Sequence, residues 1–144
     1  NCALCKQNIR GSGDNNSKAC RLFTKVALGF ITDKEEAQGV FQLQLPATSL
    51  FGAAPDKKNN PRRLSYTAYK KYLGLHDYSP ERMITRISQD ESVSYKKLLF
   101  EAVGFVPETF ALLIEDLANS ADAIAAVKTS FAVVEYNPFK PIKE

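Results

Sequence analysis

Apolar residues recur at helical spacing along most of the chain, and glycine repeatedly follows such a segment. Gly29, Gly39, Gly74 and Gly104 each stand directly before an apolar residue. A helix often ends in a left-handed residue, which glycine adopts without a steric clash, and an apolar residue then packs back on the last turn. The four pairs therefore predict short helices that end at these glycines, with Gly104 at positive φ.

Residues that favour helix starts precede most of these segments. A serine or threonine N-cap accepts a hydrogen bond from the first turn, and proline is tolerated there because its missing N–H would be unpaired anyway. The predicted helices begin near Ser17, Thr32, Ser65, Ser79, Val93, Pro107 and Ser120. We therefore expect an α+β chain that is predominantly helical, with five to seven short helices.

Two segments have the pattern of β-strands. Apolar and polar residues alternate over Val40–Leu45, and β-branched and aromatic residues cluster over Ser130–Tyr136. Because a lone strand leaves its backbone groups unpaired, we expect these two to pair as a minor two-stranded component.

The organisation predicted for residues 1–144 is a single globular domain. It carries an irregular N-terminal segment (1–16), a long loop (46–64) and an extended C-terminal tail (137–144). A loop as long as 46–64 is uncommon in a compact domain, and such loops are more often functional or bound to a partner than idle.

Composition limits the class of protein. The 144 residues are 44% hydrophobic and 24% charged, which is close to the average of globular proteins and unlike disordered chains. The net charge of +3 is too mild to indicate nucleic-acid binding without a local cluster of cations. Apolar runs stay below the roughly 18 residues that a transmembrane helix needs. We expect a soluble protein without a transmembrane segment.

The cysteines are the sharpest local feature of the sequence. Cys2 and Cys5 form a CxxC pair that could bind zinc, with Cys20 and His76 as the further ligands. A redox pair, or a group attached through a cysteine thioether, is a weaker alternative. The simpler interpretation is that Cys20 is a core residue on a helix and that the other two are plain thiols, with no cofactor.

A basic and aromatic stretch runs from Lys57 to Tyr78. It contains Arg62 and Arg63 close to Tyr66 and Tyr69. Cations beside stackable rings are typical of platforms for single-stranded nucleic acid. A solvated helix face with half-buried tyrosines explains the same pattern.

Catalytic motifs are lacking, which favours a non-enzymatic protein. The carboxylate pairs stand where helix starts and exposed faces normally carry them, and neither a nucleophile motif nor a phosphate-binding loop is present. Leu50 and Phe51 stand out in the polar loop, and Phe139 in the proline-containing tail. The first hypothesis is therefore an interaction or assembly subunit that docks other protein subunits through its loop and termini. A nucleic-acid-binding module is the alternative, and a zinc or redox domain is the second alternative.

Overall fold

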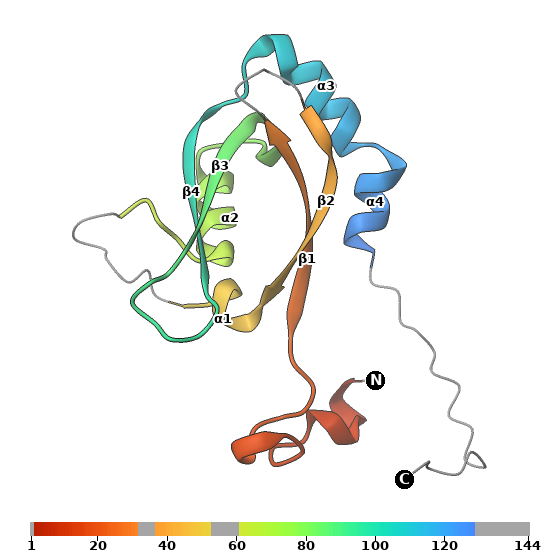
Figure 1. Ribbon diagram of the computed structural model, residues 1–144, viewed down its shortest axis with the longest axis vertical. Coiled ribbons are helices and arrows are strands. Elements are labelled where there is room, and N and C mark those ends of the chain that lie inside the picture. Colours follow the sequence, from red (N-terminus) through yellow and green to blue (C-terminus); the bar gives the residue numbers. More distant parts are fainter. Residues whose placement is uncertain (1, 32–36, 53–60, 129–144) are drawn as a thin grey trace.

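The computed structural model describes residues 2–31, 37–52 and 61–128. Within them lie two antiparallel hairpins and four helices (Figure 1). The strands are β1 (Phe23–Ile31), β2 (Ala37–Pro46), β3 (Met83–Gln89) and β4 (Leu98–Phe105). The helices are α1 (Ala47–Leu50), α2 (Tyr66–Leu75), α3 (Glu108–Ala118) and α4 (Ala121–Val127). Short 3₁₀ turns occupy Cys2–Leu4, Lys6–Asn8, Asp14–Asn16 and Pro80–Arg82. The chain is α+β, but the prediction that it is predominantly helical, with five to seven helices, is wrong.

The core lies between the two hairpins and is closed by α1 and α2. In β2, Leu43 and Leu45 point to the same face because strand side chains alternate, and Val26 pairs with Leu43 across the hairpin. Both strands therefore present apolar side chains to one side. The buried cluster consists of Val26, Leu45, Leu50, Tyr69, Leu73, Met83 and Phe100.

The short helix α1 ties the two hairpins together. The Thr48 hydroxyl donates to the Lys96 carbonyl at 2.8 Å, and the Leu98 N–H donates to Ser49 Oγ at 2.9 Å. At the same place Lys97 Nζ lies 2.9 Å from Asp90 Oδ2, and both side chains are buried. The hydrogen bonds of Thr48 and Ser49 hold the β3–β4 turn against α1, and the buried charge pair joins the two ends of that turn.

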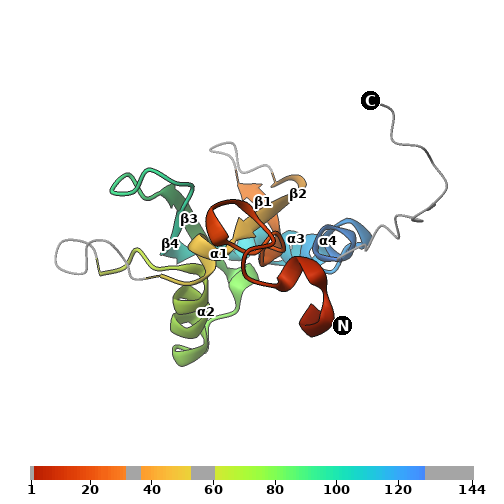
Figure 2. The ribbon, with the colours of Figure 1, turned by 90° about the horizontal axis from the view of Figure 1, so that it is seen from below.

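Helices α3 and α4 pack on the other face of the β1–β2 hairpin. Figure 2 shows α2 and α4 on opposite sides of that hairpin. Gln42 Nε2 donates to the Ala126 carbonyl at 2.6 Å. A Cβ added at Gly29 would stand 3.2 Å from Leu117 Cδ2, so the absence of a side chain at Gly29 lets α3 come close to β1.

The glycines do not end helices as the sequence predicted. Gly29, Gly39 and Gly104 lie inside strands, Gly74 lies inside α2, and Gly104 has no positive φ. At the β-bulges of the two hairpins, Gly39 and Val103 are the extra residues. A lone glycine inside a strand often marks such a bulge, which accounts for two of the four pairs.

Three predicted helices are replaced by strands. The segment from Ser17 forms β1 from Phe23 onward, and the segment from Val93 forms β4 from Leu98 onward. After Ser79 a single 3₁₀ turn leads directly into β3. In β1 and β4 apolar residues stand on both faces, and that pattern imitates helical spacing.

Three helix predictions and one strand prediction are confirmed. They are α2 after Ser65, α3 after Pro107, α4 after Ser120, and β2 over Val40–Leu45. Ser120 caps α4 by accepting a hydrogen bond from the Ala123 N–H at 3.2 Å. The capping box at 32–35 and the predicted strand 130–136 lie outside the described residues. Within the described part of the chain, none of the helices is long and apolar enough to cross a membrane.

Candidate functional site

The end of α2 positions the first side chains of the candidate site. The Tyr78 N–H donates to the Leu73 carbonyl at 2.9 Å, and Asp77 adopts a left-handed conformation with φ of 57°. This is the bonding pattern of a Schellman motif, with Asp77 where glycine is usual and an apolar ring next to it. The left-handed residue that ends the helix thus lies three residues after Gly74, where the sequence predicted it, and the helix end directs Tyr78 back beside Tyr72.

Replacing Asp77 tests this helix end. We expect Asp77→Val to lower the free energy of unfolding by about 1–2 kcal/mol, because a β-branched side chain is strained at positive φ. Asp77→Gly, the matched control, is expected to be neutral or slightly stabilising, as measured by urea denaturation. Equal losses in both variants would show that the carboxylate matters and the backbone conformation does not.

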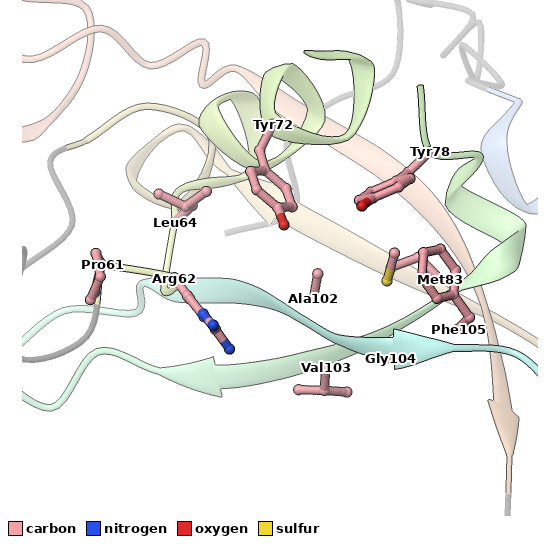
Figure 3. Close-up of a pocket in the computed structure, with 10 residues that line it drawn as sticks. All are labelled: Pro61, Arg62, Leu64, Tyr72, Tyr78, Met83, Ala102, Val103, Gly104 and Phe105. Atoms are coloured by element: carbon pink, nitrogen blue, oxygen red, sulfur yellow. The ribbon is translucent and has the colours of Figure 1, made fainter. Parts of the chain in front are cut away.

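The candidate site is a groove between the end of α2 and β4, with a volume of about 300 Å³ (Figure 3). We call it the aromatic groove. Figure 3 shows Tyr72 and Tyr78 on one side, β4 on the other and Arg62 at one end. Its lining is Pro61, Arg62, Leu64, Tyr72, Tyr78, Met83, Ala102, Val103, Gly104 and Phe105. The volume is at the lower limit for ligand sites, and suits one or two side chains better than a large cofactor.

A row of rings forms the wall of the groove. His76 lies against Tyr72 and Tyr78, with ring centroids 4.4 and 5.3 Å away, and Tyr78 meets the edge of Phe105 at 5.2 Å. These contacts hold the tyrosines in place. Phe105 nevertheless remains 60% exposed. An exposed phenylalanine beside ordered rings is a ready anchor point for another apolar group.

The groove follows the edge of β4 that faces away from β3. Leu64 pairs with Phe100 at that edge through two hydrogen bonds of 2.8 and 2.9 Å. Within the described part of the chain, no residue of β4 after Phe100 is paired at this edge. The next part of β4 lines the groove with four consecutive residues, Ala102–Phe105. Leu64, which pairs at this edge, also lines the groove, so the groove lies beside the strand edge beyond Phe100.

Arg62 is the cation of the groove, and it has no ion-pair partner among the described residues. The other described arginines of this half of the molecule, and Lys97, are already engaged. Arg63 donates to Ser88 Oγ and the Gln89 carbonyl at 3.0 and 3.1 Å. Ion pairs join Arg82 to Glu115, Arg86 to Glu101 and Lys97 to Asp90. A partner carboxylate would therefore meet Arg62 first.

The structure divides the predicted tyrosine and arginine site. Arg62 lines the groove, whereas Tyr66 and Tyr69 turn inward and pack on Phe100. The Tyr69 hydroxyl lies 2.6 Å from Thr85 Oγ1, and burial raises the pKa of Tyr69. The two inward tyrosines serve packing in this structure.

The predicted loop pair is also divided. Leu50 belongs to the buried core, whereas Phe51 is 56% exposed and does not line the aromatic groove. Burial against the domain itself thus explains why Leu50 is apolar. Phe139 lies outside the described residues, and its role in partner binding stays a prediction.

The cysteines and His76 form no metal site within the described residues. Nowhere in that part of the chain do three His, Cys, Asp or Glu side chains come close enough to hold a metal ion. Cys5 and Cys20 are free thiols and exposed, so the prediction that Cys20 is a core residue on a helix is wrong. His76 Nδ1 lies 2.9 Å from the Tyr72 carbonyl, and its ring packs on tyrosines. The side chain of Cys2 lies outside the described residues.

Sequence reasoning missed Val103 and Phe105. Both were assigned to the end of a helix, although the β-branched and aromatic residues near Gly104 also suit a strand with a bulge. Comparison with known proteins found no matching family model, no matching curated protein and no matching solved structure.

Proposed function

We propose that the protein is a non-enzymatic interaction or assembly subunit that binds an extended segment of a partner protein in the aromatic groove. The observation that carries the proposal is the coincidence of three features: a stretch of β4 edge that no described residue pairs with, an exposed phenylalanine, and ordered rings. Peptides add to such edges through main-chain hydrogen bonds, and flanking pockets select their side chains.

The chemistry of the groove indicates the partner. Ala102–Phe105 offers backbone groups that continue the pairing Leu64 makes with Phe100. The rings of Tyr72, Tyr78 and Phe105 suit an aliphatic or aromatic side chain, and Arg62 suits a carboxylate. The expected segment is therefore extended, with an apolar anchor residue and an acidic residue near it.

A protein partner is favoured over nucleic acid because most arginines near the groove already bond to groups within the protein. A nucleic-acid platform needs several free cations to contact successive phosphates. Of the described arginines around the groove, Arg63, Arg82 and Arg86 bond to groups within the protein, which leaves Arg62 alone at the groove. One cation beside apolar rings supports recognition of a peptide better than of a phosphate backbone.

The proposal is tested with two phenylalanines of matched exposure. Peptides that bind the immobilised full chain are first selected from a random display library, and their affinity is then measured in solution. We expect Phe105→Asp to weaken binding by about 30-fold or more, the effect of losing an aromatic hot spot. Phe51→Asp, whose ring is equally exposed but outside the groove, is expected to leave affinity unchanged.

Two results would contradict the proposal. One is equal affinity of the Phe105→Asp variant and the wild type for the selected peptides. The other is tighter binding of a single-stranded oligonucleotide than of any selected peptide, with the steep salt dependence of phosphate contacts.

A further inference from the structure

A second cavity, of about 630 Å³, lies between the two hairpins and shares only Met83 with the lining of the aromatic groove. Its walls include Val26–Ile31 of β1, Met83–Thr85 of β3, and Ile124 and Val127 of α4. Six consecutive residues of β1 line it. Since consecutive strand residues alternate between faces, this cavity also runs along a strand edge.

The edges at this cavity are unpaired in the described part of the chain. There β1 pairs with β2 and β3 pairs with β4, and the two hairpins form separate sheets. An edge strand presents a row of free N–H and C=O groups, and natural proteins usually cover or pair such edges. Phe30 and Ile31, at the end of the β1 wall, are exposed apolar residues. The free backbone groups of the β1 edge and the apolar lining of the cavity both suit an apolar strand as the occupant.

We propose that residues 130–136 of this chain occupy the cavity as an additional strand along β1. The chain enters residues 130–136 from a point next to the cavity. Lys25 Nζ donates to the Lys128 carbonyl at 3.3 Å, and Val127 itself lines the cavity, so the chain leaves α4 at the start of the β1 wall. From Lys25 towards Ile31 the added strand runs parallel to β1, which the long connection through α3 and α4 permits.

The length and the pattern of the segment fit the cavity. Seven residues span about 23 Å as a strand, against about 20 Å for the six residues Val26–Ile31. Phe131 and Val133 fall on one face, and Ala132 and Val134 on the other. A strand that is buried on both faces reads as such a continuous apolar run. The sequence alone suggested β2 as the partner, but β1 already pairs with β2 and offers its own free edge at the cavity.

The test is amide hydrogen exchange of the full chain, measured by NMR at single residues. In the wild type, we expect protection of the alternate amides within Val26–Ile31 that point away from β2, and of amides in 130–136. Val133→Asp puts a charge into the cavity and should speed the exchange of those β1 amides about tenfold or more. Ile142→Asp, six residues beyond the proposed strand, is the matched control and should leave them unchanged.

The readout separates local loss from unfolding. Amides of Leu73 in α2 and of Leu98 and Leu99 in β4 must keep their protection in Val133→Asp, because these residues do not line the cavity. Should Val133→Asp unfold the whole chain, deletion of 129–144 serves as the second variant, with the same expected gain in β1 exchange. Unprotected outward amides of β1 in the wild type would overturn the proposal. So would protection that appears only in a dimer, since the occupant would then be the segment of a second copy.

Discussion

Leu45→Ala is expected to lower the free energy of unfolding by about 2–5 kcal/mol, the largest effect of any single core truncation proposed for this protein. Leu45 is 0% exposed and lies in the cluster where β2, α1 and α2 meet. Removing three of its carbons leaves a cavity that packed neighbours fill only in part. The measurement is urea denaturation followed by tyrosine fluorescence and circular dichroism.

Leu113→Ala is the matched control for this truncation. Leu113 lies in the apolar helix α3, and the structure leaves it 48% exposed. We expect a loss below about 1 kcal/mol, since a half-exposed side chain forfeits less transfer free energy and leaves no enclosed cavity. Equal losses for the two leucines would contradict the placement of the core between the hairpins.

Lys97→Met is expected to lower the free energy of unfolding by about 3 kcal/mol at pH 7. Asp90 then remains buried and charged without its cation, and this cost exceeds the loss of the pair alone. The lower part of the usual range applies because the pair lies at a hairpin end beside exposed Glu91 and Ser92. In the double variant Asp90→Asn/Lys97→Met we expect part of the stability to return, because no buried charge is left.

The pH dependence follows from the ionisation of Asp90. Burial opposes the charged form, but hydrogen bonds from Ser92 and the contact with Lys97 outweigh it and hold the pKa of Asp90 below its ordinary value. Asp90 therefore binds a proton more readily in the unfolded state than in the folded state. The pair stabilises the fold fully above the ordinary aspartate pKa of about 4, and this stabilisation is lost as the pH falls through the folded-state pKa of Asp90. Unfolding at pH 7 and at pH 3 should show a smaller difference between wild type and Lys97→Met at the lower pH. A difference that stays constant would assign the loss to packing.

The sequence predicted those elements whose boundaries are set locally. Helices α2, α3 and α4 follow Ser65, Pro107 and Ser120, and β2 has a regular alternation. In contrast, β1 and β4 carry apolar residues on both faces, some buried and some exposed, so they lack the period of two. Periodicity alone does not distinguish such a strand from a helix. Gly29 and Gly104 strengthened the wrong interpretation because each was read as the end of a helix.

Only the part of the candidate site that lies within one local segment could be predicted from the sequence. Arg62 belongs to the basic and aromatic stretch, which the sequence marked as a candidate binding segment, and the structure places it at the groove. Phe105 comes from a distant strand, and only the fold brings it 5.2 Å from Tyr78. The inward turn of Tyr66 and Tyr69 likewise depends on Phe100 of β4. Long-range pairing of this kind leaves no local signature in the sequence.

The most direct test of partner binding at the aromatic groove is amide chemical-shift mapping with a peptide selected on the full chain. We predict the largest shifts at Ala102–Phe105 and at Tyr72 and Tyr78, with affinity that changes little between low and high salt. Binding through an apolar groove and backbone hydrogen bonds depends less on ionic strength than phosphate contacts do. Shifts confined to the region of Phe51, with Ala102–Phe105 unmoved, would contradict the account.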